Sequence, residues 1–341
     1  MINLEKEAIS AQPIFDEYTI HNFSLQSGSG HFDALRLGYI TLGKPHANDS
    51  GCIDNAVLLL HNTTGTSQEW LESPLAGELF GPGQPLDSTR YFLIMPDAIG
   101  FGRSSKPSEG LRAKFPNYRY HDIVQAQHQL LTEKLGVAHL RMIVGLSMGG
   151  MLAWMWGGLY PRFMDALVPI ACQPSPMSGR NWLQRRMQIE LIRNDPEWCD
   201  GEYVHQPSYY SRAPFGALMT QSVVHLQKLA PTRQDADVYY RRLVERAMKG
   251  DANDRLYQLE ASMDYDPTPM LEKIEAHVLA INFADDELNP PSLGTLEEGI
   301  ARVRNGRLVL LPVRPDSKGH HSALQAAHWK NEFQAFVEQL P

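Results

Sequence analysis

The chain has 341 residues, of which 43% are hydrophobic and 21% are charged. Such a composition is typical of globular proteins and excludes disordered, collagen-like and coiled-coil chains. The 31 basic and 39 acidic residues give a net charge of −8. This charge offers no electrostatic footprint for nucleic acid or for an anionic membrane, so we expect neither as a partner.

Cysteine usage and the N-terminal sequence indicate a protein without disulfides, metal or leader peptide. Cys52, Cys172 and Cys199 are too few and too scattered for a disulfide framework or a zinc site. Histidines are not paired with cysteines or carboxylates at ligand spacing, so we expect no metal. The first ten residues, MINLEKEAIS, lack the apolar core of a signal peptide, which predicts a cytoplasmic protein.

Apolar runs and turn residues predict a hairpin followed by alternating strands and helices. Strands are expected at 18–25, 35–42, 55–60, 91–95, 140–144, 166–172, 277–283 and 307–313, and helices at 122–135 and 149–161. The uncharged segment 142–161 contains five glycines, which favours a buried strand, turn and helix over a membrane span. This alternation predicts a doubly wound, mostly parallel sheet.

From residue 173 to about 266 the chain has no strand-like run and is rich in Arg, Gln, Tyr and Met. We therefore predict three parts: a core over 1–172, a helical lid over 173–266, and a completion of the core over 267–341. The lid follows the sixth strand. Insertions of this kind lie above the carboxyl ends of the strands, where α/β sheets bind ligands.

The motif Gly145-Leu146-Ser147-Met148-Gly149 follows an apolar strand and opens a helix. This context indicates a nucleophile that is held on a tight turn above the sheet. The turn crowds the residues two before and two after the serine, which explains why both are glycine. Ser147 is thus the candidate nucleophile.

A serine nucleophile needs a base, and the base needs an orienting carboxylate. The strand expected at 277–283 is followed by Asp285 and Asp286, and the strand at 307–313 is followed by Gly319 and two histidines, His320 and His321. Nucleophile, acid and histidine thus follow one another along the chain in the order expected for a catalytic triad on a sheet of this kind. Spacing alone leaves open which aspartate and which histidine act.

The oxyanion of an acyl-transfer reaction needs two backbone N–H donors. One is expected from Met148, the residue after the nucleophile, and the other from the loop His61-Asn62-Thr63-Thr64-Gly65. The side chains of His61 and Asn62 either contact a substrate or close the turn.

Together, the loop at 61–65, the run Ser147-Met148-Gly149-Gly150-Met151 and the segment Gly319-His320-His321 resemble the homoserine O-acetyltransferase branch of the α/β-hydrolase superfamily. The likeness extends into the lid, at Asp195-Pro196-Glu197-Trp198 and at Asp251-Ala252-Asn253 before Tyr257. The run at 97–104 is more similar to ester-cleaving members of the superfamily.

This resemblance implies an α/β-hydrolase fold with Ser147 as nucleophile, His320 as base and oxyanion donors at Thr63 and Met148. It selects Asp286 as the acid, because the family's Asp-x-Leu-x-Pro spacing begins there. It also implies, as is common in that family, a homodimer built through the lid helices.

Two departures from the family pattern concern the substrate. Ile189 stands where the family carries an arginine for the substrate carboxylate, and His321 stands where it carries an aspartate for the amino group. We expect both to contact the substrate, together with His61, Asn62 and Tyr257. Arg185, Arg186 and Arg193 are nearby in sequence, but we expect each to be a solvated helix charge.

The sequence therefore favours a serine hydrolase that cleaves a small-molecule carboxylic ester, thioester or lactone without a cofactor. An O-acyltransferase that moves an acetyl group from acetyl-CoA to an alcohol is the alternative, because it needs the same catalytic residues. A non-catalytic binding protein that keeps the fold is a second alternative.

Overall fold

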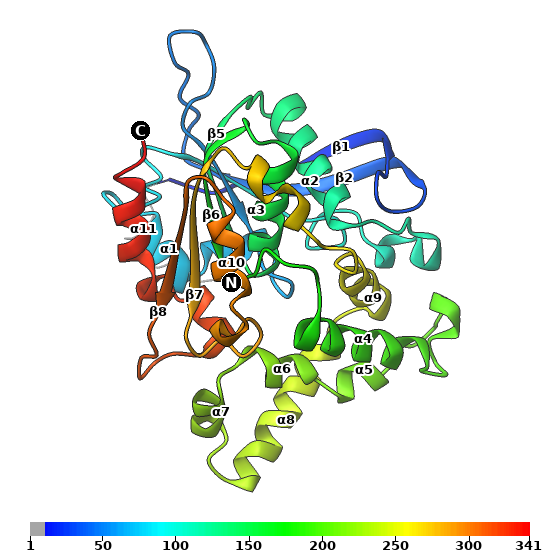
Figure 1. The fold of residues 1–341 in the computed structure, drawn as a ribbon. Coiled ribbons are helices and arrows are strands. Elements are labelled where there is room, and N and C mark those ends of the chain that lie inside the picture. The colour runs from blue at the N-terminus through cyan, green and yellow to red at the C-terminus, as the bar shows by residue number, and fades with distance from the viewer. Residues whose placement is uncertain (1–10) are drawn as a thin grey trace.

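The structure is a computed structural model that describes residues 11–341. The segment on which the expected cytoplasmic location rests therefore lies outside the described residues. The described residues form an eight-stranded sheet in the order β1-β2-β4-β3-β5-β6-β7-β8 (Figure 1). Its strands are β1 (Ile14–Ser24), β2 (His31–Leu42), β3 (Ala56–Leu60), β4 (Phe92–Pro96), β5 (Leu140–Leu146), β6 (Met164–Ile170), β7 (His277–Phe283) and β8 (Gly306–Leu311).

Strand β2 runs antiparallel to both β1 and β4, and the strands from β4 through β3 to β8 are parallel. The expected hairpin and the mostly parallel sheet are confirmed. Since parallel strands place their carboxyl ends at one edge, the loops that follow β3, β5, β7 and β8 meet at that edge.

Helices cover both faces of the sheet. Alternate residues of a strand point to opposite sides, so the apolar central strands present a face to be buried on each side. Leu58 and Leu60 of β3 pack in one core, and Val57 and Leu59 pack in the other. The first core includes α2 (Tyr120–Gln129), α3 (Met148–Leu159) and α10 (Thr295–Ala301), and the second includes α1 (Ser73–Leu79) and α11 (Lys330–Val337). Burial on both faces explains the unbroken apolar runs of the central strands.

The segment between β6 and β7 is helical, as expected. It contains α4 (Gly179–Arg193), α5 (Tyr209–Arg212), α6 (Phe215–Thr220), α7 (Val223–Leu229), α8 (Arg233–Ala247) and α9 (Ala252–Glu260). We call α4 to α9 the lid. Figure 1 shows α4 to α8, in green to yellow, gathered beyond one end of the sheet. The lid also contacts the core at α6, which packs against the turn Gly319–Leu324.

Several element boundaries differ from the sequence-based expectation, for example by four residues at the start of β2 (His31). β1 begins at Ile14, since it pairs with β2 over its whole length. β8 ends at Leu311, because Pro312 has no N–H to continue the ladder. α2 ends at Gln129 and is followed by one wide turn over Leu130–Lys134.

The uncharged segment 142–161 is divided between β5 and α3, which confirms the strand, turn and helix expected there. Among residues 11–341, no helix has the length and apolar character that crossing a bilayer requires.

Candidate active site

Ser147 lies on a strained turn between β5 and α3. Its backbone has φ of 52° and ψ of −108°, a conformation that costs a non-glycine residue about 1–3 kcal/mol. Its N–H donates to the Ile170 carbonyl at 2.8 Å, which ties the turn to β6. A Cβ at Gly145 would lie 2.1 Å from the Gly149 oxygen, and one at Gly149 would lie 2.1 Å from the Leu60 oxygen. Both glycines are therefore required by close backbone approach.

Hydrogen bonds join Ser147, His320 and Asp286 in a continuous chain. The Ser147 Oγ lies 2.8 Å from His320 Nε2, and His320 Nδ1 lies 2.9 Å from Asp286 Oδ2. His320 and Asp286 are buried, whereas Ser147 is partly exposed. With Nδ1–H donating to the carboxylate, Nε2 is left to accept the serine proton. The geometry thus selects Asp286 and His320 from the two adjacent pairs.

Asp286 is held as a carboxylate by several donors. Burial by itself raises its pKa, but His320 and hydrogen bonds from Asn289 more than offset this, so that the pKa of Asp286 is lowered. The backbone N–H groups of Leu288 and Asn289 donate to its Oδ1 at 2.8 and 3.0 Å, and Asn289 Nδ2 donates to its Oδ2 at 3.3 Å. Sequence reasoning did not assign a role to Asn289, although it lies inside the Asp-x-Leu-x-Pro motif.

The neighbouring Asp285 has a different role. Its Oδ2 accepts the Gly319 N–H at 3.1 Å, which ties the loop after β7 to the loop that carries His320. Gly319 has φ of 65°, and a Cβ there would lie 2.5 Å from the Ser222 nitrogen of the lid. The histidine loop is thus clamped between an acidic loop and the lid.

Two backbone N–H groups are available where the oxyanion donors were expected. Met148 is the first residue of α3, and N–H groups in the first turn of a helix have no partner within the helix. Across residues 11–341, no acceptor is found for the Thr63 N–H. These two groups are the donors that the sequence predicts, and their catalytic use remains a prediction.

The loop that carries Thr63 is fixed by Asn62 and Glu69. The Asn62 N–H and Nδ2 donate to the two Glu69 carboxyl oxygens at 2.7 and 2.6 Å, and Asn62 Oδ1 accepts the Thr64 N–H at 2.7 Å. Burial raises the pKa of Glu69 to about 8, against the effect of the hydrogen bonds from Asn62. The Asn62 amide is therefore used to shape the loop, and contact of this side chain with a substrate stays a prediction.

His61 and Tyr257 also have internal partners. The His61 Nδ1–H donates to the Asn62 carbonyl at 2.8 Å, and Nε2 accepts the Ala98 N–H at 3.0 Å. The Tyr257 hydroxyl donates to the Ala113 carbonyl at 3.2 Å and joins α9 to the core. Both side chains thus have a structural role, and their contact with a substrate stays a prediction.

Ile189 and His321 provide no charge at neutral pH. Ile189 is buried among the apolar side chains of the larger core. His321 is partly exposed, and burial together with the neighbouring His320 lowers the pKa of His321 to about 4. Contact of these two residues with a substrate stays a prediction.

The expectation that Arg185 is a solvated charge is wrong. Its side chain is only 3% exposed, and its Nη2 donates to Thr63 Oγ1 at 3.3 Å. Arg186 and Arg193, in contrast, are partly exposed and pair with Glu190 and Glu260. Arg185 precedes Ile189 by four residues, so the two share one face of α4. That spacing is a signal that the sequence reasoning missed.

Comparison with known proteins agrees with the fold and the motifs. The model of the alpha/beta hydrolase fold family matches residues 55–195. A homoserine O-acetyltransferase of Nitrobacter hamburgensis is 30% identical over 257 residues, which are 71% of this chain and 62% of that protein. The chain belongs to the α/β-hydrolase superfamily. Within it, the chain lies on the homoserine O-acetyltransferase-like branch.

Other similar proteins include acyltransferases and an acetylester hydrolase by name. A probable acyltransferase of Methanothermobacter thermautotrophicus is 28% identical, with 82% of this chain and 85% of that protein aligned. An acetylester hydrolase from Corynebacterium glutamicum superposes with a TM-score of 0.82 at 22% identity, covering 96% of both chains. A homoserine O-acetyltransferase from Bacillus anthracis gives 0.81 at 19% identity, covering 96% of this chain and 98% of that one. These two structures show the shared fold. The alignment with the Nitrobacter protein spans less than two thirds of that protein's length.

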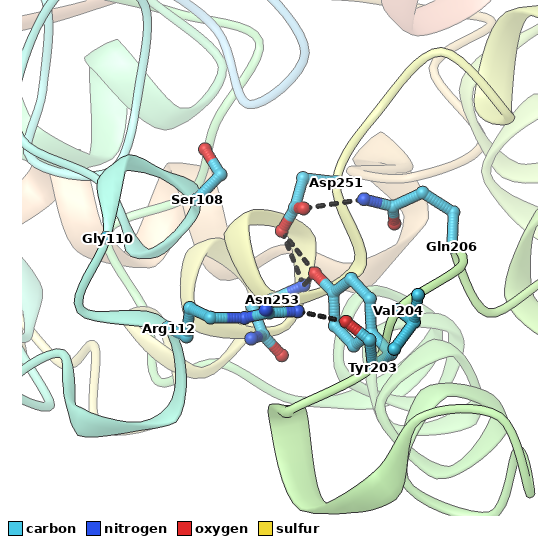
Figure 2. Close-up of a pocket in the computed structure, with 8 residues that line it drawn as sticks. All are labelled: Ser108, Gly110, Arg112, Tyr203, Val204, Gln206, Asp251 and Asn253. Atoms are coloured by element: carbon cyan, nitrogen blue, oxygen red, sulfur yellow. Dashed lines mark hydrogen bonds between the residues drawn. The ribbon is translucent and has the colours of Figure 1, made fainter.

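A cavity of about 530 Å³ lies between the loop after β4 and the lid (Figure 2). Its polar groups are paired with one another: Asp251 accepts from the Tyr203 hydroxyl at 2.7 Å and from Gln206 at 2.6 Å, and Arg112 donates to the Tyr203 carbonyl. In Figure 2, dashed lines join Asp251 to the side chains of Gln206 and Tyr203. No triad residue lines this cavity. The hydrogen bond from Arg112 to the Tyr203 carbonyl joins the core to the segment between β6 and β7.

Replacing Gly149 tests the close approach at the nucleophile turn. Gly149→Ala should lower the free energy of unfolding by about 1–3 kcal/mol, because the new methyl group meets the Leu60 backbone. The matched control is Gly216→Ala in α6, where no heavy atom lies within 4 Å of an added Cβ, and which should be neutral or stabilising by up to about 1 kcal/mol. Urea unfolding of the three proteins measures this, and equal midpoints would contradict the crowding at Gly149.

The buried Glu69 should make stability depend on pH. Because its pKa in the folded protein, about 8, lies above the ordinary value, the folded state keeps a proton that the unfolded state releases. The stabilisation is complete below about pH 4.5 and is lost as the pH rises through about 8. The stability difference between wild type and Glu69→Gln should therefore shrink from about pH 5 to about pH 9. A difference that is constant in chemical denaturation across this range would refute the assignment.

Proposed function

We propose that the protein is a serine hydrolase that cleaves a carboxylic ester through an acyl-enzyme. The observation that carries the proposal is the hydrogen-bonded chain from Ser147 through His320 to Asp286. Such a chain has the nucleophile, base and orienting acid that acyl transfer requires. The strained turn adds support, since backbone strain of this kind is characteristic of functional sites.

In the proposed reaction, the Ser147 oxygen attacks the ester carbonyl while His320 Nε2 takes the serine proton. Asp286 holds the imidazole in the required tautomer and stabilises the imidazolium that forms. The N–H groups of Thr63 and Met148 stabilise the oxyanion. His320 then returns the proton to the departing alkoxide, and a water molecule hydrolyses the acyl-enzyme with His320 again acting as base.

The second candidate is an O-acyltransferase, which the names of the sequence relatives favour. It would form the same acyl-enzyme from acetyl-CoA and transfer the acyl group to an alcohol. The triad cannot distinguish the two reactions, because they differ only in whether water or an alcohol reaches the acyl-enzyme.

Homoserine itself is disfavoured as the acceptor. The family position for the ammonium partner holds His321, whose pKa is lowered to about 4, so this side chain is neutral at neutral pH. An ammonium group without an acidic partner in a buried site costs several kcal/mol. We therefore favour a substrate without an amino group at this position.

Triad variants test the proposed catalysis. Ser147→Ala should abolish both turnover of p-nitrophenyl acetate and covalent labelling by a fluorophosphonate. Asp286→Asn should keep the fold but reduce kcat by about 10⁴-fold, because the amide favours the wrong imidazole tautomer. Absence of wild-type labelling would instead support a non-catalytic binding protein.

Partitioning of the acyl-enzyme tests hydrolase against acyltransferase. With p-nitrophenyl acetate or acetyl-CoA as donor, we expect release of free acetate to exceed acetylation of added alcohols, including homoserine. Acetate and the acetylated alcohols are to be quantified in the same reaction by mass spectrometry. Transfer that outruns hydrolysis would reverse the choice in favour of the acyltransferase.

A further inference from the structure

Two arginines of the lid lie close together and have no acidic partner. Arg185 belongs to α4 and Arg255 to α9, and these two helices pack against each other. Over the described residues, the hydrogen bonds of both guanidinium groups go to neutral acceptors. Buried charges in proteins are normally paired, so an unpaired pair of like charges indicates a missing anion.

Arg185 is the more buried of the two. Its Nε donates to Asn181 Oδ1 at 3.0 Å and its Nη2 to Thr63 Oγ1 at 3.3 Å, both of which are neutral acceptors. Its Nη1 is buried and has no hydrogen-bond partner. A guanidinium has five N–H donors in a planar fork that suits a carboxylate, and part of this fork is unused here.

Arg255 shares the environment of Arg185. Its Nε and Nη2 both donate to Gln188 Oε1, at 3.2 and 2.8 Å. Burial, and then the positive charge of Arg185, lower the pKa of Arg255 to about 10. It remains charged at neutral pH, so the repulsion between the two groups persists without a bound anion.

Tyr120 adds an unused hydroxyl to the same cluster. Its side chain is 1% exposed and its hydroxyl has no hydrogen-bond partner. Burial raises the pKa of Tyr120, and the nearby Arg185, Ser262 and Arg255 only partly offset this, so the hydroxyl stays protonated at neutral pH. The cluster therefore offers two positive charges and a neutral donor.

The contact between Arg185 and Thr63 connects this cluster to the reaction centre, since Thr63 carries one of the proposed oxyanion donors. We propose that Arg185, Arg255 and Tyr120 form a carboxylate-binding site, and that the substrate is an anionic ester bearing a carboxylate near the scissile bond. This inference rests on the proposed ester chemistry at Ser147. It names the chemical class of the substrate and gives the buried charges a partner.

The carboxylate could belong to the acyl part or to the alcohol part of the ester. Matched pairs of anionic and neutral substrates distinguish these two cases. Monomethyl succinate carries it on the acyl side, with dimethyl succinate as the neutral match. Acetoxyacetate carries it on the alcohol side, with methyl acetoxyacetate as the neutral match. For one pair, we expect wild-type kcat/KM to favour the anionic ester by about 10- to 100-fold, which is the range of charge-assisted hydrogen bonds.

Substitution of the arginines should remove this preference. Arg185→Gln and Arg255→Gln should each lower the ratio of anionic to neutral kcat/KM by about tenfold or more. The matched control is Arg186→Gln on the same helix, where the charge is partly exposed and paired with Glu190, and the ratio should not change. Equal losses in all three variants would overturn the site.

A stability measurement separates binding from a structural role. Arg185→Met should keep or raise the Tm, because it removes a buried charge that has no partner in the free protein. A structural arginine would give a lower Tm. A clear drop in Tm together with an unchanged substrate ratio would refute the proposal.

Direct binding separates failure of this inference from failure of the proposed function. Ser147→Ala is titrated calorimetrically with monomethyl succinate and acetoxyacetate, which it cannot turn over. Binding that is lost when Arg185→Gln is added supports the site even if wild type hydrolyses no ester. Labelling of Ser147 and turnover of neutral esters, without binding or preference for either anion, would overturn the carboxylate site and leave the hydrolase intact.

Discussion

The turn at Ser147 is the constraint on which the rest of the site depends. A non-glycine residue at φ of 52° persists only where its surroundings over-determine it. Here the hydrogen bond from Ser147 to Ile170 and the packing of Gly149 against the Leu60 backbone hold the turn to β6 and β3. Because β7 and β8 lie next in the sheet, their terminal loops bring Asp286 and His320 to the same edge.

The buried carboxylate of the site has hydrogen-bond donors within the fold, whereas its two buried guanidinium groups have no acidic partner. Asp286 accepts hydrogen bonds from His320, Leu288 and Asn289, so its burial is compensated within the fold. Arg185 and Arg255 have only neutral partners. A fold optimised for stability alone would pair or remove such charges, whereas a binding site keeps them for a ligand. This contrast is the basis of the proposal that the lid selects the substrate.

Much of the fold and of the triad could be predicted from sequence. The buried strands are continuous apolar runs, and the Gly-x-Ser-x-Gly motif identified Ser147 because strand, turn and helix are adjacent in the chain. The choice between Asp285 and Asp286 was not accessible from spacing, since both follow β7 directly. The resemblance to a family selected Asp286, and the structure shows the reason: Asp285 is used to hold Gly319.

The sequence by itself determined the local features: the succession of strands and helices along the chain, the nucleophile turn and the two loops that carry acid and base. Only the tertiary structure decided which polar side chains form hydrogen bonds within the fold. His61 and Asn62 are engaged in shaping the oxyanion loop, while Arg185 contacts Thr63 across 122 residues of sequence. Whether the Arg185 charge is buried depends on how the lid packs against the core. The periodicity of a helix carries no information about a contact with a residue as distant in the chain as Thr63.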